Sequence, residues 1–281
     1  MLKLSELHLV GSRKALGDIP EGKVLINTIN AHSYNVAQKD DLFAQALTGG
    51  DYLIPDGASI VKACKWLKGK SQPKERIAGW DLFEFEMERL ADRRTRDLLD
   101  KSTGGQEELL DKSTGGQEEL IDKSTGGQEA KGEKCKVMFM GSSERVLQLI
   151  RERAATDYPQ IDVVTYSPPY KAEFSDDDNA AIINAINAAN PDLLWIGMTA
   201  PKQEKWTFQH WQELDIHCHV GTIGAVFDFY AGTTQRAPIW WQRHSLEWLY
   251  RLLKEPRRMW RRYVIGNPLF LWNVLSEKFK F

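Results

Sequence analysis

Short apolar segments alternate with longer segments of helical apolar spacing along most of the chain. The strand-like segments are Val24–Thr28, Tyr52–Ile54, Lys136–Met140, Asp162–Tyr166, Asp192–Gly197 and His217–Gly221. The helix-like segments are Ala31–Leu47, Ser59–Leu67, Trp80–Asp92, Glu144–Thr156, Ser175–Ala189 and Lys202–Gln212. Strands that are separated by helices form a parallel sheet with helices on its faces. We therefore predict an α/β fold with a Rossmann-like, mainly parallel sheet, flanking helices and a C-terminal amphipathic helical appendage.

Length and composition are those of an ordinary globular protein. The chain has 281 residues, of which 42% are hydrophobic and 27% are charged, enough for one large domain or two small ones. The first residues are too few and too polar for a signal peptide, and there is no run of about 18 apolar residues that could span a bilayer. We expect a cytoplasmic protein whose contact with a membrane is at most peripheral.

The cysteines and acidic residues predict no metal and no cofactor. Cys64, Cys135 and Cys218 are far apart in the sequence, without a C-x-x-C pair, so neither a disulfide framework nor a zinc site is expected. The triplet Asp176–Asp178 invites comparison with the D-x-D that holds a divalent ion in many sugar-nucleotide enzymes. It follows Ser175 and opens a helix, where the helix dipole favours acidic side chains, and we prefer that interpretation.

A tandem repeat interrupts the alternation of strands and helices. Its units begin DKSTGGQE at Asp100, Asp111 and Asp122, with an 11-residue period. Two glycines in each unit disfavour a stable helix, so we predict a flexible or partly helical surface insertion, either without function or used for docking or spacing. The predicted parts of the chain are an N-terminal α/β part (1–99), the insertion (100–132), a Rossmann-like part (133–238) and a C-terminal tail (239–281).

Polar residues follow two of the predicted strands. Asp56 comes after Tyr52–Ile54 and before a helix, and Thr28 and Asn30 end another strand. Ligands of parallel α/β sheets bind at the carboxyl ends of the strands, so these side chains could line one cleft. The alternative is that Asp56 only caps the following helix or shapes a turn.

A predicted helix begins after Pro201, immediately downstream of the strand Asp192–Gly197. Proline suits the start of a helix because its missing N–H would have no partner there. The free N–H groups and the dipole of a helix N-terminus favour a phosphate, and Lys202 and Gln203 add hydrogen-bond donors. A solvated helix start without a ligand is the alternative.

A glycine-containing turn follows the last predicted strand. Gly221 and Gly224 match half of a Rossmann glycine fingerprint, a weak signal without the full spacing. Phe227 and Asp228 add an aromatic side chain and a carboxylate. Such aromatic residues more often belong to a hydrophobic core than to a platform that stacks on a base.

The C-terminal tail is basic and rich in tryptophan. Leu246, Leu249 and Leu253 fall on one face of a helix, and six basic residues lie between 251 and 262 with one acid, Glu255. Tryptophan beside Lys and Arg suits the interface of an anionic membrane; a helix packed on the domain with a solvated basic face is the alternative. No recognised nucleic-acid motif accompanies the basic residues, so we expect no nucleic-acid partner.

Taken in order, several sequence blocks resemble the WecG/TagA/CpsF family of bacterial glycosyltransferases. The matching blocks are TINA (28–31), PDG (55–57), RIAGWDL (76–82), APKQE (200–204), GTIG (221–224), FD (227–228), RAP (236–238) and LEWLYRL (246–252). The resemblance covers nearly the whole chain outside the insertion. Their common order makes the match far more specific than any one block.

This resemblance implies an inverting, metal-independent transfer in surface polysaccharide synthesis. A hexose or N-acetylhexosamine, such as N-acetylmannosamine or glucose, would pass from a UDP-sugar to an undecaprenyl-diphosphate-linked sugar. The 133–238 part would bind the UDP-sugar, and the tail would contact an anionic membrane surface. The protein would act as a peripheral protein on the inner face of the bacterial cytoplasmic membrane. Whether it forms a homo-oligomer is left open.

The resemblance also implies roles for individual residues. Asp56 matches the catalytic base, Thr28 a residue beside it, and Gln203 a polar residue of the active site. The tail arginines that would fold over the site and contact phosphate are Arg251, Arg258 and Arg261. The other residues expected to bind substrate are Asn30, Arg76, Pro201, Lys202, Gly221, Gly224, Phe227, Asp228 and Arg236.

The chain departs from the family pattern at two places. The family often has a glycine pair where Thr222–Ala225 keeps one glycine, and Gly-Leu-Glu-Trp where this chain has Ser245–Trp248. N-acetylmannosamine is therefore not assumed as the sugar, and the ending NPLFLWNVL suggests an exopolysaccharide branch that uses glucose or another hexose.

A non-catalytic membrane-associated module that binds nucleotide or lipid phosphate is the alternative function. A sugar-nucleotide epimerase or dehydrogenase would need a complete G-x-G-x-x-G.

Overall fold

Six parallel strands form one sheet in the computed structural model, which describes residues 2–93 and 134–279. The strands are β1 (Val24–Ile29), β2 (Tyr52–Pro55), β3 (Cys135–Gly141), β4 (Ile161–Tyr166), β5 (Leu193–Gly197) and β6 (His219–Thr222). Their order across the sheet is β2-β1-β6-β5-β3-β4. The predicted α/β, Rossmann-like fold is confirmed. The repeat predicted over 100–132 lies outside the described residues.

The strands on either side of the repeat belong to the same sheet. Ile26 of β1 lies opposite Gly221 of β6, and Gly221 lies opposite Trp195 of β5. Because all the pairs are parallel, the carboxyl ends of β1, β2, β5 and β6 meet along one edge. That edge is where ligands of open α/β sheets bind.

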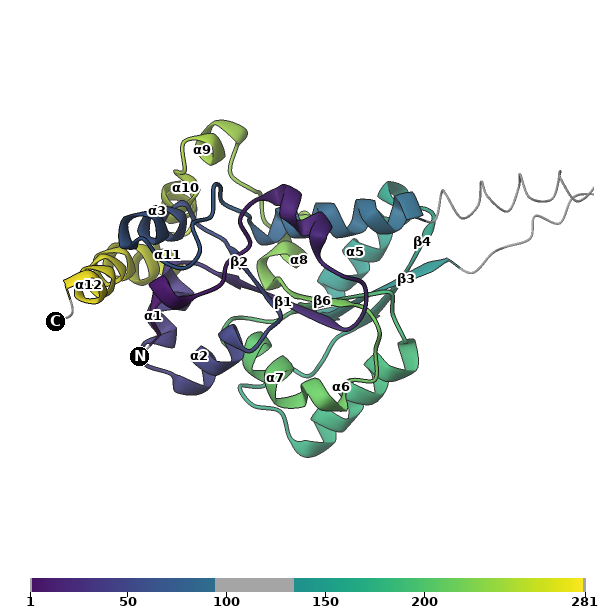
Figure 1. Cartoon of the computed structure of the whole chain (residues 1–281). Coiled ribbons are helices and arrows are strands. Elements are labelled where there is room, and N and C mark those ends of the chain that lie inside the picture. The colour runs from purple at the N-terminus through teal and green to yellow at the C-terminus, as the bar shows by residue number, and fades with distance from the viewer. Residues whose placement is uncertain (1, 94–133, 280–281) are drawn as a thin grey trace, which may run out of the picture.

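Helices cover both faces of the sheet (Figure 1). One face carries a helix over 79–93, α5 (Glu144–Asp157) and α8 (Gly224–Tyr230); the other carries α2 (Asp41–Thr48), α6 (Asp176–Ala189) and α7 (Lys202–His210). Successive side chains of a strand point to opposite faces, so Trp195 packs in the first layer and Ile196 in the second. Neighbouring residues of one strand therefore pack against different layers of helices.

The last described helix, α12, contributes to a hydrophobic core. Phe270 and Val274 of α12 (Gly266–Phe279) are buried in a cluster with residues of α1 (Ala31–Ala37) and α3 (Ala58–Leu67). The Glu277 carboxylate accepts hydrogen bonds from the backbone N–H groups of Leu4 (2.9 Å) and Ser5 (2.7 Å). The predicted C-terminal appendage therefore ends in a helix that packs on the N-terminal part. Its preceding elements are α9 (Ile239–Arg243), α10 (Glu247–Lys254), α11 (Pro256–Trp260) and a π-helical turn (Arg261–Ile265).

The helix predicted over Ala31–Leu47 is two helices, α1 and α2. Asp40 begins α2 as its N-cap, because its carboxylate accepts the backbone N–H of Phe43 at 3.0 Å. The apolar spacing continues through the break, which is why periodicity alone joined the two. Similarly, α7 ends at His210, two residues earlier than predicted, and continues as a 3₁₀ turn over Trp211–Glu213.

A buried ionic network lies at the amino end of β6, far along the sheet from the carboxyl edge. His219 Nδ1 contacts Glu86 Oε1 at 2.9 Å and His219 Nε2 donates to the Pro20 carbonyl at 2.8 Å. Arg89 Nη2 lies 2.8 Å from the other Glu86 oxygen. Burial alone would lower the pKa of His219, but the hydrogen bond and charge of Glu86 and the Pro20 carbonyl raise it above its ordinary value.

This network predicts a pH-dependent contribution to stability. A histidine whose pKa is raised on folding stabilises the fold fully below its unfolded pKa of about 6.5, and that contribution is lost as the pH rises through the folded value. Glu86→Gln should therefore lower the free energy of unfolding by about 2 kcal/mol at pH 6, and by less at higher pH. Urea denaturation across this pH range measures the effect. The control variant Glu6→Gln, at an exposed residue, should change the free energy of unfolding by less than about 0.5 kcal/mol. A loss that does not vary with pH would contradict the assignment of His219.

Candidate active site

Asp56 lies at the carboxyl end of β2, beside the end of β1. The Asp56 backbone N–H donates to the Ile29 carbonyl at 2.8 Å, and Thr28 lies opposite Ile54 in the sheet. The Asp56 side chain is half-buried, and no hydrogen bond from the described residues reaches its carboxylate. The structure therefore leaves both carboxylate oxygens free to accept a proton.

The neighbouring Asn30 has a structural task. Its side-chain oxygen accepts the backbone N–H groups of His32 and Ser33, both at 3.0 Å, and so caps α1. That oxygen is therefore occupied. Only the amide nitrogen of Asn30 is left for the predicted contact with substrate. The edge at β1 and β2 thus brings together Thr28, Asn30 and Asp56, as expected from the sequence.

Charged residues from distant segments surround Asp56. Burial raises the pKa of the Asp56 carboxyl above its ordinary value, and the charge of Glu247 adds to this, whereas Arg76, Arg251 and Arg262 hold it down. A carboxylate with a raised pKa is a better proton acceptor near neutral pH than an exposed one. The position is therefore suited to a general base.

An ion bridge fixes α10 above this edge. Glu247 Oε2 lies 2.9 Å from Arg76 Nη1, and Glu247 Oε1 lies 2.7 Å from Arg251 Nη2. Arg76 precedes the 79–93 helix, and the next backbone N–H, that of Ile77, donates to the Pro55 carbonyl of β2 at 3.0 Å. Burial raises the pKa of Glu247, but the two arginines lower it below its ordinary value overall. The bridge holds one predicted tail arginine, Arg251, close to Asp56.

Three residues of this site were not expected from the sequence: His32, Glu247 and Arg262. Burial, and secondly the charge of Arg262, lowers the pKa of His32 to about 4, so this imidazole is neutral at physiological pH. The Arg262 Nε is buried without a hydrogen-bond partner in the described residues. In the sequence, Arg262 is one member of a run of basic residues, and nothing there distinguishes it from the others. Its neighbour Arg261 is exposed, with its guanidinium 5.6 Å from the Trp260 ring.

Gln203 links the turns that follow β5 and β6. Its side-chain oxygen accepts the backbone N–H groups of Met198 and Gly224, both at 3.2 Å, and its amide donates to Glu204 at 2.9 Å. A Cβ on Gly224 would lie 2.2 Å from the Met198 carbonyl oxygen, so the close approach of two backbones requires glycine there. The Gly224 N–H is occupied by Gln203, and the buried Gln203 supports the turns from within the protein.

Two residues expected to bind substrate pack inside the protein instead. A Cβ on Gly221 would lie 2.3 Å from the Trp195 ring, so the missing side chain makes room for that ring. Phe227 is fully buried and packs edge-to-face on Phe139 with 5.3 Å between ring centroids. The glycine and the aromatic signals thus have packing causes in this structure.

The start of α7 lies against the loop that precedes α6. The Lys202 ammonium lies 3.4 Å from the centroid of the Phe174 ring and donates to the Lys171 carbonyl at 2.5 Å. Lys202, which directly follows Pro201, is therefore engaged by that loop. At the other end of the same loop, Ser175 is the N-cap of α6, and Asp178 in the first turn completes a capping box with it and pairs with Lys171 at 2.7 Å. The described residues contain no group of three or more His, Cys, Asp and Glu side chains placed to hold a metal ion.

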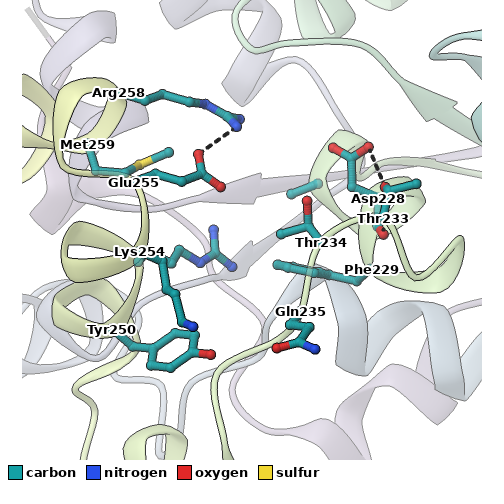
Figure 2. Close-up of a pocket in the computed structure, with 12 residues that line it drawn as sticks. Asp228, Phe229, Thr233, Thr234, Gln235, Tyr250, Lys254, Glu255, Arg258 and Met259 are labelled. Carbon is teal, nitrogen blue, oxygen red and sulfur yellow. Dashed lines mark hydrogen bonds and ion pairs between the residues drawn. The ribbon is translucent and has the colours of Figure 1, made fainter.

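A cavity of about 300 Å³ lies between α8 and the helices α10 and α11 (Figure 2). Figure 2 shows Lys254 and Arg258 on the tail side facing Asp228 and Phe229 of α8. Arg251 also lines the cavity, with its guanidinium 4.9 Å from the Phe229 ring. Because Arg251 belongs to both the cavity and the ion bridge, the cavity adjoins the Asp56 site.

Two predicted arginines differ in their surroundings. Arg258 is exposed and pairs with Glu255 at 2.9 Å on the rim of the cavity. Arg236 stacks its guanidinium over the Trp80 ring at 5.2 Å. Burial lowers the pKa of Arg236, although Glu247 and Asp81 lie near enough to oppose this. Arg236 is thus next to the ion bridge, whereas Arg258 is reached from solvent.

Comparison with known proteins identifies relatives across nearly the whole chain. The family model described as "Glycosyl transferase WecG/TagA/CpsF family" matches residues 7–114 and 119–281. A protein of Bacillus subtilis (strain 168) is 26% identical over 90% of this chain and 80% of its own length, and one of Bacillus spizizenii is 28% identical over 86% and 75%. A Staphylococcus aureus (strain MW2) protein is 23% identical over 92% and 82%. All three are named N-acetylglucosaminyldiphosphoundecaprenol N-acetyl-beta-D-mannosaminyltransferase.

The ion bridge predicts how α10 is held. Glu247→Gln removes the charge that both arginines contact, and a hydrogen bond to a charged group contributes about 1.5–3 kcal/mol. Amide hydrogen exchange over 247–254 should accelerate by roughly tenfold or more. Glu255→Gln, which breaks the more exposed pair with Arg258, serves as the control and should leave α10 protected. Equal exchange in the two variants would show that other contacts hold α10.

Proposed function

Because the chain belongs to the WecG/TagA/CpsF family of glycosyltransferases, we propose that it transfers a sugar from a UDP-sugar to a lipid-linked sugar. The acceptor proposed is a sugar joined through diphosphate to undecaprenol, and the product is an intermediate of a surface polysaccharide. The names of the relatives support such an acceptor, since each specifies N-acetylglucosaminyldiphosphoundecaprenol. The sugar transferred is a hexose or N-acetylhexosamine, with N-acetylmannosamine and glucose as the first candidates.

The free carboxylate of Asp56 is the observation that carries this proposal. As the acceptor hydroxyl attacks the anomeric carbon, Asp56 takes its proton. The bond from that carbon to the UDP oxygen breaks, and UDP leaves with the electron pair. A single displacement inverts the anomeric configuration. Thr28, one register position from the end of β1, lies at the same edge and is proposed to orient the acceptor.

Positive charge is needed where the leaving diphosphate gathers negative charge. Arg251, Lys254 and Arg258 line the cavity beside Asp56, and the charge of Arg262 also acts on Asp56. These cations are proposed to bind the diphosphate, so the reaction needs no divalent metal. Glu247 is proposed as a positioning residue, because it orients Arg76 and Arg251 without reaching the substrate itself. Gln203 is likewise proposed to position the turns of the donor site.

Contact with a membrane is proposed to occur through the tail. No described helix is both long enough and apolar enough to cross a bilayer. Of the fourteen exposed large hydrophobic side chains in the described residues, eleven lie between 239 and 279. They include Trp240, Trp260 and Trp272, and the basic residues of α10 and α11 lie among them. Such a surface suits peripheral binding at an anionic interface, where the lipid-linked acceptor is found.

The proposal is tested by incubating the protein with a series of UDP-sugars and a synthetic lipid-diphosphate-linked N-acetylglucosamine. UDP release that depends on both substrates is expected with one or a few donors. EDTA should leave the rate unchanged if the transfer is metal-independent. UDP release without a new glycoside would mean that the protein hydrolyses the donor, and no UDP release with any donor would favour a binding protein over a transferase.

Asp56→Asn should lower kcat by roughly 10²–10⁴-fold, because the amide cannot take the proton. UDP affinity, measured by calorimetry, should stay close to that of the wild type because the substitution preserves the shape of the side chain. In the wild type, kcat/KM should fall as the pH drops below the raised pKa of Asp56. The rate of Asp56→Asn should lack that acidic limb. Wild-type turnover in this variant would exclude Asp56 as the base.

A further inference from the structure

The segment from Gly57 to Lys74 is strongly basic. It contains five lysines (Lys62, Lys65, Lys68, Lys70 and Lys74) and no acidic residue. All five are exposed. In the part of the chain that the structure describes, none of them forms a salt bridge, whereas Arg76, Arg151 and Arg153 each pair with a carboxylate. This concentration of unpaired positive charge is not explained by the fold.

Three of these lysines surround one hollow in the surface. Lys62 and Lys65 come from α3, and Lys74 comes from the loop that follows it. The other residues that line the hollow are Val61, Gln72 and Pro73. With three ammonium groups and no acid around it, the hollow has a positive potential that favours an anion. Its charge suits a phosphate group.

An exposed apolar surface adjoins this hollow. Trp66, which follows Lys65 in α3, is 45% exposed, and its ring lies 6.2 Å from that of Phe279 of α12. Lys278 donates to the Trp66 carbonyl at 3.0 Å. Trp272 and Leu275 of α12 are also exposed, and α3 and α12 lie at the same end of the molecule in Figure 1. Cations beside exposed tryptophan and aliphatic side chains are typical of a membrane interface.

We propose that the hollow formed by Lys62, Lys65 and Lys74 binds the phosphate headgroup of an anionic phospholipid while Trp66 and α12 enter the interface. The assignment rests on the membrane contact proposed above and extends it from the tail to α3. A phospholipid fits better than a free anion because the apolar side chains beside the hollow would meet its acyl region.

The test uses the full chain and vesicles of phosphatidylcholine, with or without an equal part of phosphatidylglycerol. The triple variant Lys62→Gln, Lys65→Gln, Lys74→Gln should bind the anionic vesicles about a hundredfold more weakly than the wild type, from roughly fivefold per lysine. Its binding to neutral vesicles should not change. The matched control, Lys14→Gln, Lys39→Gln, Lys134→Gln, removes the same charge from exposed lysines elsewhere and should weaken binding by no more than about threefold.

Two results would overturn the proposal. Equal weakening by the two triple variants would mean that only net charge matters, and full competition by inorganic phosphate would indicate a site for a free anion. Transfer to an acceptor dispersed in neutral detergent is measured in parallel and should be the same in the wild type and both triple variants. If transfer is absent in all three while the vesicle result holds, the proposed function fails and the lipid site stands. If transfer is intact but the triple variant of Lys62, Lys65 and Lys74 binds anionic vesicles as the wild type does, the lipid site fails and the proposed function stands.

Discussion

The bridge of Arg76, Glu247 and Arg251 is the interaction on which the candidate site depends. The Arg76–Glu247 contact of 2.9 Å joins the loop beside β2 to α10, and the Glu247–Arg251 contact of 2.7 Å within α10 uses the other oxygen of the same carboxylate. Without Glu247, two guanidinium groups would face each other near Arg236 and Arg262, at a cost in repulsion. With it, the arginines around Asp56 still outnumber the acids. The site therefore keeps an excess of positive charge, which an anionic substrate such as a nucleoside diphosphate would neutralise.

The interior of the protein supports this edge from the other side. Gln203 receives the N–H groups of two turns, and Glu204 orients its amide. Burial raises the pKa of Glu204 to about 7, with its second oxygen unpaired among the described residues. The Gly224 turn thus depends on a polar contact with Gln203 as well as on a glycine. Its backbone is held in place before any ligand arrives.

The sequence was sufficient for the sheet and for part of the site, because both follow from local patterns. Alternation of strands and helices placed Asp56 at a strand end, where β1 and β2 converge. The charge partners were not predictable in the same way, since Glu247 meets Arg76 across 171 positions and no spacing records such a contact. At Gly221 and Phe227 the sequence signal was visible, but its cause could not be told from the sequence. A glycine needed beside a tryptophan ring and one needed beside a phosphate look the same in a sequence.

Both ends of the tail are held on the rest of the protein, and this determines how the tail could bind a membrane. The ion bridge holds α10 at one end, and Glu277 ties α12 to the amino terminus at the other. Between them, Leu253, Trp260 and Ile265 are exposed although Met259 is buried. The apolar side chains thus already face outward while the backbone is anchored. Binding at an interface would need no refolding of the tail, and the same helices would hold Arg251 beside Asp56 throughout.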